Sequence, residues 1–151
     1  MICAKAFPLF LLFILSFCLA DAQSPLTGNN SGGNGNFVVE NYYKIKWGFA
    51  DEFISLWKAN HYPLLRKATE KGDILSVSAS TPKLHSGEDT RWDFRVIIVF
   101  KNAEAAFDPD LTTPYKSILY PDQESYKKAE QHRFELLIAH WDIETSSVQL
   151  N

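Results

Sequence analysis

The chain has 151 residues, of which 14% are aromatic, and a formal net charge of −3. Nucleic-acid binding requires a concentrated basic surface, which this composition does not provide, so no nucleic-acid partner is expected. Both cysteines, Cys3 and Cys18, lie near the N-terminus, so the rest of the chain offers neither a disulfide nor a thiolate.

The N-terminus has the pattern of a cleavable export signal. A basic residue precedes an almost wholly apolar run, residues 7–20, which is too short to cross a bilayer as a stable helix. The run ends in the triplet Ala-Asp-Ala at positions 20–22, the small-residue pattern that signal peptidase cleaves. We therefore predict a signal peptide over residues 1–22, cleavage after Ala22, and a periplasmic or secreted product that has left the membrane. An uncleaved membrane anchor is the alternative.

Residues 23–36 are rich in glycine, asparagine and serine and lack periodic apolar residues. This composition predicts a flexible linker between the cleavage site and the fold. The folded domain is then expected over residues 37–151.

Residues 38–47 alternate β-branched and aromatic residues with polar ones, a pattern typical of a strand. The alternation assigns Tyr43, Ile45 and Trp47 to one face, and Gly48 ends the strand. Trp47 and the three other tryptophans all lie in periodic segments, so we expect them in the core or in the wall of a pocket.

The next segment, residues 49–68, has the apolar spacing of an amphipathic helix. Acidic residues in its first turn and basic residues in its last turn fit the helix dipole, and Gly72 marks its end. Pro63 lacks the N–H that would bond to the Ala59 carbonyl, so we expect a kink or break near His61.

Residues 74–80 and 92–101 are expected to form the next two strands, joined by a polar hairpin loop over residues 81–91. The later strand has apolar residues on both of its faces. One face is assigned Trp92, Phe94, Val96, Ile98 and Phe100, and the other Ile97 and Val99. Because neither face is polar, the sheet needs a cover on each side.

Asn102 is a good N-cap for a helix that follows it directly. Residues 108–121 contain three prolines and little periodicity, which predicts a long loop, either a lid over a ligand or a packed excursion without function. Asp122 is expected to cap a second helix that reaches about residue 139. Residues 141–148 alternate again and are expected to form the last strand.

The order of these elements is strand, helix, strand, strand, helix, strand. This order is the split βαβ plan of an α+β, ferredoxin-like domain, with a four-stranded antiparallel sheet and both helices on one face. The first and third strands are expected at the centre. In a single ferredoxin-like domain the other face of the sheet is exposed to water. Because the third strand is apolar on that face too, we expect a second subunit to cover it.

Three segments carry a resemblance to a known group of proteins: YKIKWGFADEF at residues 43–53, HYPLL at 61–65 and FRVIIVF at 94–100. With them the chain resembles the dimeric α/β-barrel superfamily, in which two such sheets pack across a two-fold axis with the helices outside. The resemblance implies a homodimer and a ligand pocket between helices and sheet. Members of the superfamily include cofactor-independent monooxygenases, lactone isomerases, haem-degrading enzymes and uncharacterised proteins, so the fold does not select an activity.

Asn60 and His61 continue the apolar face of the first helix, so at least one of them should point toward the sheet. His61 is our candidate for a proton acceptor or hydrogen-bond donor. In the alternative interpretation it is half-exposed and caps carbonyls freed by Pro63. The predicted ligand-binding residues are Tyr43, Trp57, Asn60, His61 and Arg95.

Arg95 lies on the third strand, where a buried guanidinium would need a carboxylate partner. Glu40 on the neighbouring strand or Asp93 could supply it. The resulting charge either orients an anionic ligand or forms a structural ion pair at the seam of the dimer.

The remaining histidines, His85, His132 and His140, lack the spacing of a zinc site, so no metal is expected. We find no phosphate-binding glycine loop and no nucleophile elbow, and we expect no cofactor.

Three functions stay open. The first is an exported domain that binds or transforms a small apolar molecule between helices and sheet. The second is a non-catalytic homodimeric interaction module. The third is haem binding or degradation, with His61 or His140 as the axial ligand. The sequence does not decide whether the protein is an enzyme.

Overall fold

The computed structural model describes residues 35–84, 86–148 and 150. The predicted signal peptide and all but the last residues of the predicted linker lie outside these residues, as does His85. Among the residues described, no helix is both long enough and apolar enough to span a membrane. The elements are β1 (Phe37–Ile45), α1 (Ala50–Leu56), a π-helical segment (Trp57–His61), α2 (Tyr62–Lys71), β2 (Ile74–Ser80), a 3-10 turn (Glu88–Thr90), β3 (Phe94–Phe100), α3 (Ala103–Ala106), α4 (Thr113–Leu119), α5 (Gln123–Glu135) and β4 (Leu137–Thr145).

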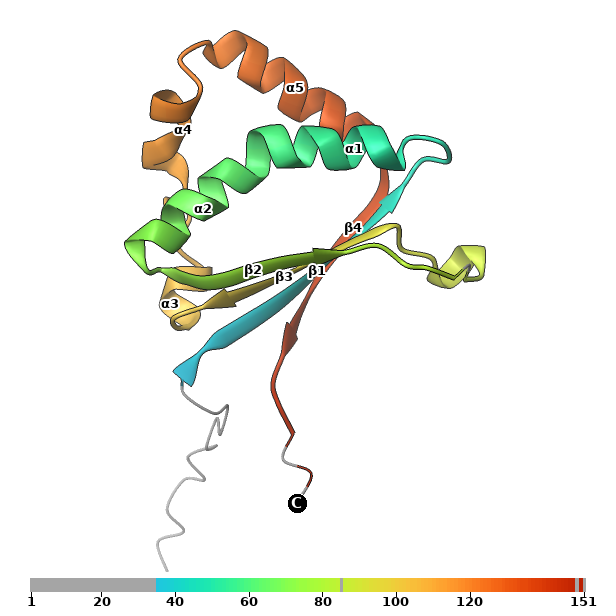
Figure 1. The fold of residues 1–151 in the computed structure, drawn as a ribbon, viewed down its shortest axis with the longest axis horizontal. Coiled ribbons are helices and arrows are strands. Elements are labelled where there is room, and N and C mark those ends of the chain that lie inside the picture. Colours follow the sequence, from blue (N-terminus) through green and yellow to red (C-terminus); the bar gives the residue numbers. More distant parts are fainter. Residues whose placement is uncertain (1–34, 85, 149, 151) are drawn as a thin grey trace, which may run out of the picture.

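The strands form one antiparallel sheet in the order β2-β3-β1-β4. The first and third strands are central, as predicted, and α1, α2 and α5 lie on one side of the sheet (Figure 1). The predicted α+β, ferredoxin-like class is confirmed. The sheet of the single chain is open, with β2 and β4 as its edges.

Alternation along β3 separates two faces of the sheet. Phe94, Val96, Ile98 and Phe100 are buried beneath the helices, on what we call the inner face. Arg95, Ile97 and Val99 alternate with them on the opposite, outer face and are only partly buried. Burying a large apolar side chain contributes about 1.5–3 kcal/mol, so the inner face carries most of the core. Phe53, Ile45, Leu64, Ile74 and Val96 are the largest side chains that are completely buried.

The predicted kink at Pro63 is a π-helical turn rather than a break. The N–H of Tyr62 donates to the carbonyl of Trp57, five residues earlier, and Pro63 falls in the first turn of α2. A missing N–H is tolerated in the first turn of a helix, because no intrahelical partner is waiting for it there. Gly72 then ends α2 in the left-handed conformation, with φ of 88°.

Two predicted boundaries in the C-terminal third are wrong. The segment expected to be a loop contains α4, because Pro114 lies in its first turn, where proline starts a helix instead of breaking one. The helix expected to reach residue 139 ends at Glu135, and β4 begins at Leu137. Leu137 and Ala139 pair with Ile45 and Lys44 at the end of β1, and this strand pairing overrides their helical periodicity.

The tryptophans do not all lie where the alternation placed them. Trp57 is buried, but Trp47 is 68% exposed because β1 ends at Ile45, before the chain reaches it. Trp92 was assigned to the side of Phe94, yet its ring packs edge-on against Tyr42 of the outer face, with 5.7 Å between centroids. The strand begins only at Phe94, so the alternation does not extend back to Trp92.

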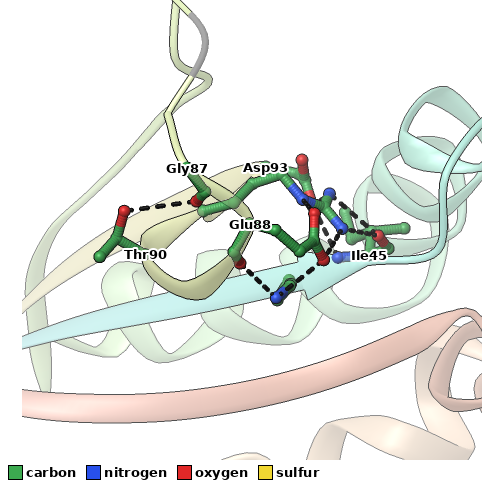
Figure 2. A network of polar contacts seen from close by, with 7 residues as sticks. Ile45, Gly87, Glu88, Thr90 and Asp93 are labelled. Atoms are coloured by element: carbon green, nitrogen blue, oxygen red, sulfur yellow. Dashed lines mark hydrogen bonds and ion pairs between the residues drawn. The ribbon is translucent and has the colours of Figure 1, made fainter.

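A buried arginine fastens the loop between β2 and β3 to the end of β1 (Figure 2). Arg91 is 6% exposed and pairs with Glu88 and Asp93, and its guanidinium donates to the carbonyl of Ile45 at 3.2 Å. Asp93 in turn accepts a 2.7 Å hydrogen bond from the N–H of Ile45. Trp47 covers this network, since the guanidinium lies 4.2 Å from its ring centroid.

Candidate functional site

An aromatic cluster joins the π-helical segment to the inner face of the sheet. Trp57, 3% exposed, comes from the π-helical segment, and Tyr43, 5% exposed, comes from β1. Both rings contact Phe94, whose centroid lies 5.3 Å from that of Trp57 and 5.7 Å from that of Tyr43. We call these residues, with the two histidines described next, the Tyr43–Trp57 cluster.

Two histidines flank the aromatic rings. His61, in the π-helical segment, has its ring centroid 5.8 Å from that of Trp57. His140, on β4, stacks on Tyr43 with 4.4 Å between centroids and 9° between the planes. Its place follows from strand register, because Tyr43 and His140 are paired residues of β1 and β4.

Burial keeps two groups of the cluster, the imidazole of His61 and the phenol of Tyr43, uncharged at neutral pH. It lowers the pKa of His61 from 6.5 to about 4, with the nearby positive charge of Arg133 as the second cause. Burial also raises the pKa of the Tyr43 phenol to about 12. At neutral pH the cluster therefore presents a phenol that can donate a hydrogen bond and a neutral imidazole that can both donate and accept.

The indole N–H of Trp57 is buried and has no hydrogen-bond partner among the described residues. Burial and the charges of Arg133 and Asp142 are the main influences on the pKa of Tyr43, and the Trp57 N–H lowers that pKa slightly. The N–H therefore lies near the phenol, although the two groups do not meet the geometry of a hydrogen bond. An unpaired buried donor destabilises a fold by about 1–3 kcal/mol. A small movement of the Tyr43 hydroxyl, or a bound molecule with an oxygen acceptor, would satisfy this group.

The positive charge beside the Tyr43–Trp57 cluster, that of Arg133, is paired with a carboxylate. Arg133 of α5 is 3% exposed and holds Glu130 through two contacts, at 3.1 and 2.8 Å. Its guanidinium also lies 5.7 Å from the ring centroid of Phe53 and 4.5 Å from that of Phe134. Because Glu130 already neutralises Arg133, we interpret this ion pair as structural and not as a binding site for an anionic ligand.

Tyr120 donates to carbonyl groups of the π-helical segment just before Pro63. Its hydroxyl, which follows α4, donates to the carbonyl oxygens of Ala59 at 2.9 Å and Asn60 at 3.0 Å. The alternative interpretation of His61 as the cap of these carbonyls is wrong, because Tyr120 takes that position. No local pattern predicts this contact, since the two segments are 60 residues apart.

The structure does not bring all five predicted ligand-binding residues together. Tyr43, Trp57 and His61 meet in the cluster, and Asn60 precedes His61 in the π-helical segment. Arg95 lies on the outer face, because its neighbour Phe94 is the residue that pairs with Tyr43.

Arg95 has the carboxylate partner that its position requires. Glu40 lies 3.4 Å from the guanidinium and also accepts a 2.7 Å hydrogen bond from the Tyr42 hydroxyl. The Arg95 Nε donates to Ser80 at 3.3 Å. Asp93, the other predicted partner, pairs with Arg91 instead.

Two surface grooves lie away from the cluster. One, of about 680 Å³, lies where α2, β3 and α3 end; its Asp73 is paired with Lys71 and Lys101. The other, of about 310 Å³, is lined by Trp47 and Leu84 among others. None of the five predicted ligand-binding residues lines either groove.

Within the part of the chain that the structure describes, no three histidine, cysteine or acidic side chains are grouped to hold a metal ion. His132 contacts Glu52 at 2.7 Å, and His140 contacts Asp142 at 3.1 Å. Both contacts are pairs rather than ligand sets.

Comparison with known proteins gives a fold but no close relative. No protein-family model matches the chain, and no curated protein sequence matches it. A dimeric ferredoxin-like protein from an uncultured marine organism is 8% identical with a TM-score of 0.50, and the match covers 76% of this chain and 90% of that one. A putative antibiotic biosynthesis monooxygenase from Bordetella bronchiseptica is 9% identical (TM-score 0.48; 76% and 99% covered). A dimeric ferredoxin-like protein of unknown function from Bacteroides fragilis is also 9% identical (TM-score 0.44; 75% and 97% covered).

The likeness to the marine protein shows that the chain has the ferredoxin-like fold. The ferredoxin-like fold that the sequence predicted is thereby confirmed. At this level of identity the likeness says nothing of activity, so function has to be argued from the cluster and from the outer face.

Proposed function

We propose that the protein is an exported homodimer whose subunits each bind a small, largely apolar molecule beside the Tyr43–Trp57 cluster. The observation that carries the proposal is the buried, unpaired indole N–H of Trp57. An oxygen acceptor on a ligand, such as a carbonyl or hydroxyl group, would satisfy it.

The chemistry around this N–H favours a neutral ligand. The phenol of Tyr43 and the imidazole of His61 are both uncharged at neutral pH, for the reasons of burial given above. Arg133 is occupied by Glu130. The other side chains of the cluster carry aromatic rings, so apolar contact would supply most of the binding energy and one or two hydrogen bonds would orient the molecule.

The test compares Trp57→Phe with wild type, using prodan, an apolar fluorescent naphthyl ketone, as the probe. Phenylalanine keeps an aromatic ring at the site and removes the N–H. We expect wild type to bind prodan with a blue-shifted emission and Trp57→Phe to bind it at least tenfold more weakly. Trp47→Phe, at the exposed tryptophan, is the matched control and should bind as wild type does. Equal affinities in all three proteins would refute this site.

The homodimer rests on a different observation, the apolar outer face of the sheet. Trp141 and Ile143 of β4 are 36% and 44% exposed on it, beside the partly buried Ile97 and Val99. Exposed apolar areas of this kind mark interaction surfaces, and the ferredoxin-like marine protein is described as dimeric. Light scattering after size exclusion should give twice the monomer mass.

A non-catalytic homodimeric module is the second candidate, and the same outer face favours it. The two candidates separate in the prodan experiment, since a module that only assembles has no reason to bind the ketone through Trp57. The haem hypothesis stays a prediction, and titration with haem, followed in the Soret region, tests it.

Export is supported by the sequence alone, through the apolar run and the triplet at positions 20–22. Intact mass measurement of the protein recovered outside the cytoplasm should place the new N-terminus at Gln23. A product that retains residues 1–22 would refute cleavage and favour the membrane anchor.

A further inference from the structure

The smaller of the two surface grooves lies at the end of the sheet where the β1–α1 turn and the loop between β2 and β3 project (Figure 1). Its lining comes from these two segments and from the start of α1. Trp47 and Trp92 supply aromatic surface, and Asp51 supplies a carboxylate. We call it the Trp47 groove. It is separate from the Tyr43–Trp57 cluster, since no residue of that cluster lines it.

Trp47 is held in place although most of its surface is free. The residue is 68% exposed, and the Arg91 guanidinium lies 4.2 Å from the centroid of its ring. The turn that carries it is closed by a 3.1 Å hydrogen bond from the N–H of Phe49 to the carbonyl of Lys46. Gly48 makes this turn possible, with φ of 85°. An indole ring with a fixed orientation loses little entropy when a ligand packs on it.

Arg91 is the single cation among the lining residues that the structure describes, and it is not available to an anion. All three nitrogen atoms of its guanidinium donate, to Glu88, Asp93 and the carbonyl of Ile45 (Figure 2). Lys44 also pairs with Glu88, at 2.9 Å, so the network holds two cations and two carboxylates. Because these charges cancel, the network provides no positive charge that could hold an anionic ligand.

Asp51 is the charge of the groove that remains. Arg91 and Asp93 neutralise each other, and no ion pair within the described part of the chain involves Asp51. The groove therefore combines exposed tryptophan surface with one carboxylate. Organic ammonium ions fit this combination, because a positive charge is attracted both to the face of an indole ring and to a carboxylate. The formal net charge of −3 on the whole chain acts in the same direction.

We propose that the Trp47 groove binds a small organic ammonium ion, with the ammonium group beside Asp51 and an apolar body against Trp47 and Trp92. The groove, of about 310 Å³, lies at the lower end of the volumes found for small-molecule sites, so a single ring with a short amine-bearing chain suits it. This site is independent of the proposed function, because it uses neither the N–H of Trp57 nor the second subunit.

Three ligands that share one ring and differ in charge test the site: phenethylammonium, neutral phenethyl alcohol and anionic phenylacetate. Each is titrated into the isolated protein, and NMR follows the indole N–H signals of the four tryptophans, assigned from single Trp→Phe variants. We expect phenethylammonium to shift the signals of Trp47 and Trp92, with an affinity in the millimolar range because exposed cation–π contacts and ion pairs are weak. Phenethyl alcohol should bind at least threefold more weakly, and phenylacetate should give no saturable shift.

Two variants identify the groups that bind the cation. Asp51→Asn keeps the size of the side chain and removes its charge, so it should weaken phenethylammonium about threefold and leave phenethyl alcohol unchanged. Trp47→Leu should weaken phenethylammonium at least threefold, with the Trp92 signal as the reporter. Glu52→Gln is the matched control, because it removes the same charge from the next residue of α1, which does not line the groove. It should bind as wild type does.

Four outcomes would overturn the proposal. Equal affinities for the three ligands would show that charge is not recognised, and an equal loss in Asp51→Asn and Glu52→Gln would show only a general effect of net charge. A shift confined to Trp57 would place the amine in the Tyr43–Trp57 cluster. The absence of any shift with phenethylammonium would show that the groove is not a site for organic cations.

Discussion

The hydroxyl of Tyr120 donates a 2.9 Å hydrogen bond to the carbonyl oxygen of Ala59, four residues before Pro63. In a regular α-helix this carbonyl would accept from the N–H of residue 63, which proline lacks, so Tyr120 provides a donor beside the proline. The contact also ties the segment that follows α4 to the π-helical segment that carries Trp57 and His61.

Replacing Tyr120 with phenylalanine should lower the free energy of unfolding by about 0.5–1.5 kcal/mol, because the exposed carbonyl of Ala59 and the partly buried carbonyl of Asn60 lose their donor. In a Pro63→Ala background the same change should have a smaller effect, since residue 63 regains an N–H. Urea denaturation of the four proteins gives the coupling energy, which we expect at about 1 kcal/mol. Tyr126→Phe, on the ring stacked against Tyr120, is the control. Strict additivity would contradict the partnership.

Acidification should destabilise the fold through His61. Its pKa is about 4 in the folded protein and 6.5 when exposed, so the unfolded chain binds more protons between these values. The free energy of unfolding should fall as the pH drops from about 6.5 to about 4, by roughly 2 kcal/mol after allowance for partial solvent exposure. Below that range the contribution is fully lost.

His61→Gln should flatten this part of the stability profile. Denaturant melts at half-unit steps of pH measure the slope, which is compared with that of His132→Gln, a variant that keeps His61. An unchanged slope in His61→Gln would mean that another group is responsible.

Trp57→Phe should unfold with an unchanged or higher free energy, although the residue is in the core. The change removes an unpaired buried donor, which offsets the lost ring area. Trp57→Ala removes the whole ring and should lose about 3–5 kcal/mol. Chemical denaturation in the absence of any ligand separates the two outcomes, and a large loss in Trp57→Phe would show that the N–H is satisfied within the protein.

Arg91→Met should lose about 3 kcal/mol of stability, because Asp93 keeps its charge in a largely buried place without its partner. Arg66→Met is the matched control. Arg66 contacts Glu70 at 3.8 Å on the surface of α2, and its loss should change the free energy of unfolding by less than about 0.5 kcal/mol. Thermal melts of both variants in the same buffer compare the two arginines.

Ile143→Asp should convert the proposed dimer to monomers while the fold survives, since the new carboxylate would have to enter the interface without a partner. Ile118→Asp, at an isoleucine that is 71% exposed on α4, should leave the dimer intact. Light scattering over a dilution series measures the molar mass of each variant in solution, and circular dichroism checks that the variant is folded. A dimeric Ile143→Asp would move the interface elsewhere.

The element order and the disturbance at Pro63 could be predicted because each depends on local pattern, and the central strands followed from the split βαβ plan that this order matches. Alternation in residues 94–100 alone separates the buried inner positions from the outer ones. What a single strand cannot give is its register with its neighbours. The stacking of His140 on Tyr43 depends on such register, and so does the pairing of Arg95 with Glu40.

Other errors came from extending a local pattern past its element. Trp47 and Trp92 lie just beyond strand ends, where alternation no longer decides the face. Pro114, one of three prolines in the predicted loop, lies in the first turn of α4, where proline is compatible with a helix. Arg95 was grouped with Tyr43, although strict alternation puts it opposite Phe94 and so on the other side of the sheet.

The π-helical turn at Trp57–His61 gives the helical segment from α1 to α2 one place where its length can change. A turn of this kind holds one residue more than an α-helical turn, whereas each residue of a regular helix turns the chain by about 100°. Deleting one solvent-facing residue there, such as Lys58, would let the segment relax to regular α-helix with the residues on both sides still facing the sheet. A deletion within α2 itself would instead turn part of Leu64, Leu65 and Ala68 away from the sheet, so we expect the π-helical turn to tolerate shortening far better than the helix that follows it.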